Sequence, residues 1–237
     1  MLSKKVLKDI QSLGLKKHRE ETGLFVAEGP KIVDELLQLI PGQLEAVYAT
    51  EEWEGSDSEK ITRISPAELE RISQLKTPNQ VLAVVKQWES IAPTAEGFLL
   101  YLDTIQDPGN FGTIIRTADW FGVKNIVCSA GCADFYNPKV VQATMASIAR
   151  VNVYYDEEAS WLAAQSLPRF AASLHGQPLD GFAKISEGIL IIGNESKGIR
   201  KEYLQLAEEK ITIPRRGDAE SLNAAVATGI LLSHLVK

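Results

Sequence analysis

Several features that would narrow the function are missing from this sequence of 237 residues. No apolar run approaches the roughly 18 residues of a membrane-spanning helix, and the basic N-terminus lacks the apolar core and cleavage site of a signal peptide. The sequence has 2 cysteines, Cys128 and Cys132, and 3 histidines that do not cluster with them. Two cysteines cannot form a disulfide framework. We therefore expect a cytoplasmic, metal-free protein whose cysteines belong to the core.

Nucleotide-binding fingerprints are also missing. The dinucleotide motif GxGxxG is absent, because residues 109–112 supply only GxxG and residues 193–198 lack the middle glycine. A Walker A loop is absent as well. These absences disfavour a nicotinamide-dependent oxidoreductase, which remains one alternative, and they disfavour enzymes that use nucleoside triphosphates.

The charge is acidic overall, with a formal net charge of −6. This argues against a protein that coats nucleic acid indiscriminately, since such domains are usually basic. Residues 1–19 nevertheless carry a net charge of +5, from one aspartate and the basic residues Lys4, Lys5, Lys8, Lys16, Lys17 and Arg19. Such a face can bind phosphates. It can equally be the solvated side of a helix, because apolar residues recur there at helical spacing.

The remaining composition is that of a globular α/β protein, with 45% hydrophobic and 24% charged residues. In residues 1–90, predicted strands alternate with predicted helices, which indicates a small parallel or mixed sheet. The strands are expected at 24–29, 44–50 and 80–87, and the helices at 30–40 and 67–75. A stretch without periodicity follows, and we place a linker at residues 91–97.

The alternation restarts at Phe98 and continues to the C-terminus. Continuous apolar strands with crossover helices predict a mostly parallel sheet that is covered on both faces. The strands are expected at 98–105, 125–130, 151–155, 169–174, 188–193 and 210–214, and the helices at 113–121, 137–149, 158–165, 199–209 and 221–235.

Ligands in such sheets bind beyond the carboxyl ends of the strands, and three polar turns follow strands here. In the first turn, the spacing of Asn110 and Arg116 across a turn-to-helix junction can bring both side chains to one rim. Arginine suits a phosphate because its planar fork binds two oxygens. The alternative is a surface arginine that pairs with Asp119, three residues further along the helix.

The other two turns carry further candidates. Glu195 follows a buried strand, where it can complement the dipole of the next helix. We expect Ser221 to cap the last helix, so that Leu222 and Asn223 are available for other roles in the site. Asn223 opens an otherwise apolar helix, so its amide needs a partner.

Together the three turns resemble motifs of the SpoU family of RNA ribose 2′-O-methyltransferases, in the SPOUT superfamily. The first has Asn110, Gly112 and Arg116 as N-x-G-x-x-x-R, the second is GNESKG at 193–198, and the third is an I-P pair followed by S-L-N at 221–223. The match covers residues 98–237. Ala146 stands where the family often has glycine, a departure that we attribute to packing.

The N-terminal half resembles the family's substrate-binding domain, which favours RNA contact by the basic N-terminus. The resemblance thus implies a substrate-binding domain at 1–90, the linker at 91–97, and a methyltransferase domain at 98–237 with a deep trefoil knot. It further implies a homodimer without metal or membrane contact, acting on RNA, with ribosomal RNA favoured over transfer RNA. S-adenosylmethionine would bind along the backbone of Ile192, Gly193, Ile213, Pro214 and Leu222.

The resemblance assigns catalytic roles to Asn110, Arg116, Glu195, Ser221 and Asn223. Asparagine and serine side chains can position ribose and cofactor, and Glu195 can hold Asn110 or a backbone amide. Family mechanisms make the arginine a general base, which is difficult because a guanidinium keeps its proton up to a pKa above about 12. We favour phosphate binding and stabilisation of the developing alkoxide. A catalytically silent RNA-binding protein of the same fold is the alternative, and the intact set of five residues argues against it.

Overall fold

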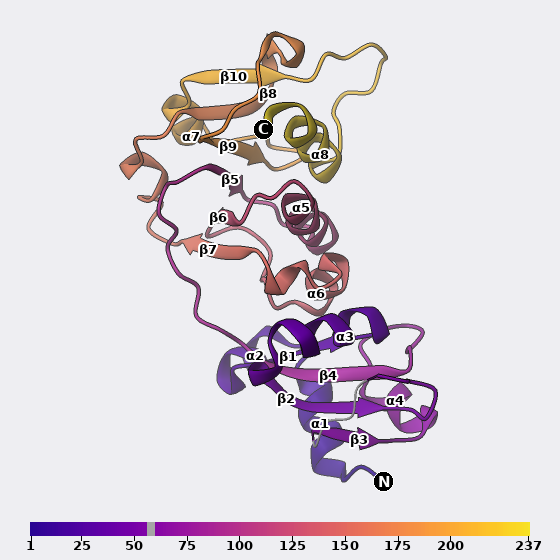
Figure 1. Ribbon diagram of the computed structural model, residues 1–237. Coiled ribbons are helices and arrows are strands. Elements are labelled where there is room, and N and C mark those ends of the chain that lie inside the picture. Colours follow the sequence, from indigo (N-terminus) through magenta and orange to yellow (C-terminus); the bar gives the residue numbers. More distant parts are fainter. Residues whose placement is uncertain (56–59) are drawn as a thin grey trace. The chain divides into compact units, whose positions relative to one another are not determined.

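The computed structural model describes residues 1–55 and 60–237 (Figure 1). The chain forms two compact units. The first comprises residues 1–89 together with 134–149, and the second comprises 90–133 together with 150–237. The segment 134–149 thus belongs to the first unit, although it lies within the stretch that resembles a methyltransferase. The domain boundaries drawn from the sequence remain a prediction.

The described part of the first unit contains a mixed, 4-stranded sheet in the order β1-β4-β2-β3. The β1–β4 and β2–β4 pairs are antiparallel and the β2–β3 pair is parallel. The elements of this unit are α1 (Lys4–Ser12), α2 (Lys16–Thr22), β1 (Leu24–Glu28), α3 (Pro30–Leu39), β2 (Leu44–Ala49), β3 (Ile61–Arg63), α4 (Pro66–Ile72), β4 (Val81–Lys86) and α6 (Pro138–Thr144).

Helices cover both faces of this sheet. On one face α1 and α4 bury a continuous apolar cluster against alternate strand residues, including Leu7, Ile10, Val26 and Leu69, and α3 lies on the other face (Figure 1). The helix α4 begins at a complete capping box formed by Ser65 and Glu68, as the sequence indicated. The strand β3 was not anticipated, because three residues carry too little periodicity to be recognised.

Polar and aromatic contacts hold the segment 134–149 in the first unit. The buried guanidinium of Arg19 pairs with Asp134, and Tyr136 packs against Phe25 with ring centroids 4.8 Å apart. The Tyr136 hydroxyl also donates to the carbonyl oxygen of Trp88 and accepts from its backbone N–H, both at 3.0 Å. Arg19 is 2% exposed, so its inclusion in a basic surface is wrong.

The basic surface near the N-terminus is therefore smaller than the sequence indicated. Lys16 and Lys17 pair with Glu20 and Glu21 one helical turn away, at 3.5 and 3.8 Å. Three exposed lysines on α1 have no ion-pair partner among the described residues: Lys4, Lys5 and Lys8.

The second unit contains a 6-stranded sheet in the order β10-β8-β9-β5-β6-β7 within its described residues. Every neighbouring pair is parallel, which confirms the predicted mostly parallel sheet. The elements of this unit are β5 (Phe98–Asp103), α5 (Pro108–Trp120), β6 (Asn125–Ser129), β7 (Asn152–Asp156), β8 (Arg169–Pro178), β9 (Gly188–Gly193), α7 (Lys201–Leu206), β10 (Glu209–Thr212) and α8 (Ala224–Leu235).

This sheet is also covered on both faces. α7 packs over a cluster that includes Leu99, Tyr101, Ile191 and Tyr203, and α5 and α8 lie together on the opposite side (Figure 1). Because the strands are parallel, all their carboxyl ends meet at one edge. Within the described residues, no helix combines the length and hydrophobicity that a membrane span requires.

Three local predictions differ from the structure. Helix α5 begins at Pro108, so Asn110 lies in its first turn and Gly112 in its second, and neither lies in a preceding loop. The helix expected at 158–165 is only a 3-10 turn at Leu162–Ala164, because Ala159 has φ of +53°, outside the right-handed helical region.

The helix expected at 137–149 also ends early, at Thr144. Met145 and Ala146 have φ of +49° and +71°, in the left-handed region that favours glycine. The departure at Ala146 therefore concerns backbone conformation, and attributing it to packing alone is wrong.

Candidate active site at the carboxyl edge of the second sheet

The carboxyl end of β5 is fixed by a buried carboxylate. Asp103 is fully buried and accepts hydrogen bonds from Arg200 through its backbone N–H (2.8 Å) and its Nε (2.9 Å). The hydroxyl of Ser129, at the end of neighbouring β6, donates to the same carboxylate at 3.2 Å. One carboxylate therefore joins the ends of two adjacent strands to the start of α7.

The loop 194–198 after β9 is held by the side chain of Asn194, which bonds to backbone groups within the loop and beyond it. The Oδ1 of Asn194 accepts from the backbone N–H groups of Ser196 (2.9 Å) and Lys197 (3.2 Å), and its Nδ2 donates to the carbonyl oxygen of Thr104 at 2.9 Å. A β-carbon at Gly193 would lie 2.4 Å from the backbone of Gly198. Position 193 therefore has to be glycine for the loop to fold back this closely.

Three of the predicted catalytic residues form a hydrogen-bonded chain. The Nδ2 of Asn110 donates to Glu195 Oε1 at 2.5 Å, and the Nδ2 of Asn223 donates to Asn110 Oδ1 at 2.8 Å. Asn110 lies 85 residues before Glu195 and 113 before Asn223. The fold thus brings together one residue from each of the three turns.

The start of α8 explains how Asn223 takes part. Its Oδ1 accepts from the backbone N–H groups of Ala225 (3.0 Å) and Val226 (3.3 Å), so Asn223 is the N-cap residue. The prediction that Ser221 caps this helix is wrong, because asparagine caps as well as serine and the helix begins only at residue 224. Ser221 is exposed and has no hydrogen bond within the described residues.

Arg116 does not belong to this chain of hydrogen bonds. Asn110 and Arg116 are both helical, and six residues at 100° each separate their directions by about 120° around the axis. Arg116 is exposed and makes no ion pair in the described part of the structure. Asp119, the alternative partner, binds Arg150 at 2.8 Å. The guanidinium is therefore free to meet a ligand from solvent.

Four of the five predicted cofactor-binding residues lie at the ends of two strands of the same edge, and the fifth precedes α8. Ile192 and Gly193 end β9, whereas Ile213 and Pro214 follow β10, with β8 between these strands. Two strand spacings correspond to roughly 10 Å. Leu222, just before α8, is 44% exposed. The exposed side chain of Leu222 can contact an adenosine moiety, and the five residues remain our prediction for the cofactor site.

The sequence interpretation missed Asp103, Arg200 and Thr104. A carboxylate that ends a buried strand was a visible signal, but its partner lies 97 residues away. Thr104 has φ of +55°, which is unusual for a β-branched residue and indicates a constrained backbone at this edge.

The two cysteines occupy different environments. Cys128 is fully buried in β6, and burial raises the pKa of its thiol. Cys132 lies half-buried beyond the end of the strand and donates to the Leu102 carbonyl oxygen at 3.2 Å. A hydrogen bond from Cys128 lowers the pKa of Cys132. Only Cys128 is therefore a core residue, and the expectation for Cys132 is wrong.

Comparison with known proteins places this arrangement in a family. The model of the SpoU rRNA Methylase family matches residues 97–233, and that of the MRM3-like substrate binding domain matches residues 4–83. The first match covers more than half of the chain. The chain therefore belongs to the SpoU rRNA methylase family, whose members are RNA methyltransferases.

Individual relatives agree with this assignment. The chain is 34% identical to the Bacillus subtilis 23S rRNA (guanosine(2553)-2'-O)-methyltransferase RlmP, over 97% of this chain and 95% of that relative. A solved structure of a putative TrmH-family RNA methyltransferase from Porphyromonas gingivalis is 35% identical, with a TM-score of 0.87 and coverage of 98% and 97%. An AdoMet-bound rRNA methyltransferase from Sinorhizobium meliloti is 31% identical, with a TM-score of 0.84 and coverage of 98% and 94%.

Proposed function

We propose that this chain methylates a ribose 2′-hydroxyl of ribosomal RNA at the carboxyl edge of its second sheet. The class of reaction follows from the family: the chain is an RNA 2′-O-ribose methyltransferase that uses S-adenosylmethionine. The single observation that supports the location is the hydrogen-bonded chain from Asn223 through Asn110 to Glu195, which joins all three motifs. The trefoil knot remains part of the proposal.

The protein's own residues would mainly position the reactants. S-adenosylmethionine supplies an activated methyl group, so the hydroxyl oxygen has to be held in line with it at about 3–3.5 Å. Asn110 and Asn223 are fixed by their mutual hydrogen bond. The exposed hydroxyl of Ser221 is free to bind ribose or cofactor. These neutral groups can orient a sugar without competing for its proton.

Arg116 would act as an electrostatic group rather than as a base. Its exposed guanidinium, without a partner in the described structure, is placed to bind an RNA phosphate bidentately. The same positive charge would stabilise the negative charge that develops on the ribose oxygen as its proton passes to solvent water. The location of the protein would be the cytoplasm, where ribosomal RNA is available.

The active unit would be a homodimer formed through α8 and α5. Val226 and Ile230 lie four residues apart on one side of α8 and are 52% and 37% exposed, and Leu222, just before the helix, is 44% exposed. Trp120, at the end of α5, is 82% exposed. A helix that is apolar on all sides is normally buried, and a second copy of this chain would cover these side chains. Light scattering of Val226→Arg should show a monomer where the original protein is a dimer.

The proposed activity is tested with ribosomal RNA from cells that lack this gene. Purified protein and labelled S-adenosylmethionine should restore one ribose methylation, located by mass spectrometry. Arg116→Ala should abolish incorporation, whereas Arg71→Ala, which removes an exposed arginine of α4, should not. Incorporation into transfer RNA alone would contradict the proposed substrate. Failure of calorimetry to detect cofactor binding would contradict the activity itself.

A further inference from the structure

The strand β1 is the edge strand of the first unit's sheet, and part of its backbone points away from that sheet. It is bonded to β4 at both ends, from Gly29 N to Val81 O (2.9 Å) and from Gln87 N to Gly23 O (2.7 Å). In an antiparallel pair, residues that exchange bonds alternate with residues that do not. The even-numbered residues of β1 therefore direct their N–H and C=O groups to the open edge.

Two of these residues lack backbone partners. Leu24 is satisfied, because its N–H donates to Thr22 Oγ1 and its carbonyl oxygen accepts from Gln87 Nε2. The N–H and C=O groups of Val26 and Glu28 have no hydrogen bond in the described structure, although these residues are only 2% and 4% exposed. Buried backbone groups are nearly always paired with protein, water or ligand. An unpaired stretch of this kind requires a partner.

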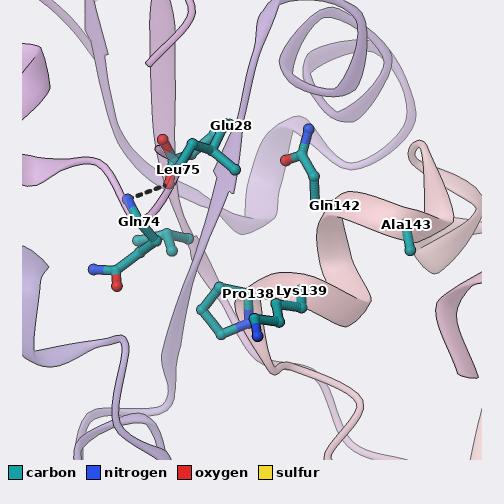
Figure 2. A pocket seen from close by; sticks show the side chains of 8 residues that line it. Glu28, Gln74, Leu75, Pro138, Lys139, Gln142 and Ala143 are labelled. Carbon is teal, nitrogen blue, oxygen red and sulfur yellow. Dashed lines mark hydrogen bonds between the residues drawn. The ribbon is translucent and has the colours of Figure 1, made fainter. Parts of the chain in front are cut away.

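A cavity borders this stretch of β1. Its volume is about 270 Å³, and besides Val26 and Glu28 it is lined by Gln74, Leu75, Pro138, Lys139, Gln142 and Ala143. Figure 2 shows these side chains gathered from β1, from the segment after α4 and from α6. All belong to the first compact unit. We call this cavity the β1-edge pocket.

The pocket combines apolar walls with neutral hydrogen-bonding groups. Leu75, Pro138 and Ala143 offer apolar surface for a flat ring. The carboxylate of Glu28 is already engaged, since it accepts from the hydroxyl of Ser73 and from the backbone N–H of Gln74 (2.7 Å), and burial raises its pKa. Recognition therefore depends on the strand backbone, which presents donors and acceptors side by side.

Two side chains of α6 complete the pocket. The amide of Gln142 and the ammonium of Lys139 have no hydrogen bond or ion pair among the described residues. An amide can pair with the donor and acceptor atoms of a base, and the cation can neutralise a phosphate attached to it. An added β-strand is excluded as the occupant, because α6 packs against β1 and a cavity of about 270 Å³ is too small for one.

We propose that the β1-edge pocket binds one unstacked nucleobase of the RNA substrate. The edge of the base pairs with the free backbone groups of Val26 and Glu28, Gln142 contacts the same base, and Lys139 contacts its phosphate. Proteins that read RNA commonly splay single bases out and bind their edges in this way. This inference rests on the proposed function, because it assumes that RNA is the ligand of the protein.

The test uses nuclear magnetic resonance of the full-length, isotope-labelled chain. The 5′-monophosphates of adenosine, guanosine, cytidine and uridine are added singly at millimolar concentration. At least one should shift the backbone amide signals of Val26 and Glu28 downfield, as expected when these N–H groups gain an acceptor. Ribose 5-phosphate, which has no base, should leave both signals in place.

Variants separate the pocket from the surface around it. Ala143→Phe should fill the cavity and abolish the shifts. If Ala143→Phe does not fold, Gln142→Ala is the second variant, and it should weaken nucleotide binding. Lys139→Ala should weaken binding of the nucleotide about fivefold and leave that of the nucleoside unchanged. Lys31→Ala, which removes an exposed lysine of α3, is the matched control and should change neither.

The outcomes also distinguish this inference from the proposed function. Unmoved amides with all four nucleotides would mean that the pocket holds water only and would overturn the inference, as would shifts that persist in Ala143→Phe. Calorimetry with S-adenosylmethionine and methylation of ribosomal RNA are measured on the same samples. If cofactor binding and methylation are both observed while the amide signals of Val26 and Glu28 do not shift, only the inference fails. If both fail, the proposed function fails.

Discussion

The amide of Asn223 performs two tasks that substitutions can separate. Its Oδ1 caps α8, and its Nδ2 holds Asn110. Asn223→Ser keeps a good cap, but a hydroxyl is too short to reach Asn110. Asn223→Ala loses both functions. The lost cap destabilises the helix by about 1 kcal/mol, which lowers the melting temperature by about 2–4 °C in a chain of this size.

The lost hydrogen bond should affect the rate equally in both variants. A neutral hydrogen bond contributes about 1 kcal/mol, so methylation of ribosomal RNA should slow about fivefold in each. Ser65→Ala, which removes the cap of α4 in the other unit, should lower stability without changing the rate. An Asn223→Ser enzyme with the original rate would refute the reasoning. The reasoning would also be refuted if the methylation rates of Asn223→Ser, Asn223→Ala and Ser65→Ala fell in proportion to their melting temperatures.

Three further predictions concern single residues. Arg116→Ala should retain the melting temperature and lose nearly all activity, whereas Arg116→Lys should recover most of the rate only if charge matters more than the planar fork. Asp103→Asn should lower stability by about 2 kcal/mol in thermal scans, less than for a fully buried pair, because Arg200 is 43% exposed. Hydrogen bonds from the backbone of Leu2 and from Ser65 lower the pKa of Glu68 from 4.5 to about 2. The stabilisation of the fold by ionised Glu68 is fully present above its unfolded-state pKa of 4.5 and should be lost as the pH falls towards 2. A titration of Glu68 followed by nuclear magnetic resonance would show the lowered pKa.

Local signals in the sequence predicted much of the fold. The strand β9 was predicted with its observed bounds, Gly188–Gly193, because a run of apolar residues stands between two glycines. The early start of α5 had a signal that was overlooked. Asp107 caps the helix and Pro108 occupies its first position, which is a common helix start. The motif residues also predicted that Asn110, Glu195 and Asn223 would meet, but Arg116 and Ser221, predicted with them, do not join their hydrogen bonds.

Long-range contacts could not be predicted in the same way. Arg19 was assigned to a basic surface from its neighbours, but Asp134, 115 residues away, draws it into the interior. The stretch from 134 to 149 was likewise assigned by its motif rather than by its contacts. Such pairings depend on how the chain returns to the same place, and neither propensity nor periodicity contains that information.

The direction of the hydrogen bonds in the site follows from the end of one helix. The N-terminal N–H groups of α8 require an acceptor, so Asn223 has to present its oxygen to them and its nitrogen to Asn110. Asn110 then accepts with its oxygen and donates with its nitrogen, so the next group has to be an acceptor. Glu195, which when ionised only accepts, meets that requirement. The orientation of both amides is thus determined by the backbone of α8, and the polar site is aligned without any charged donor.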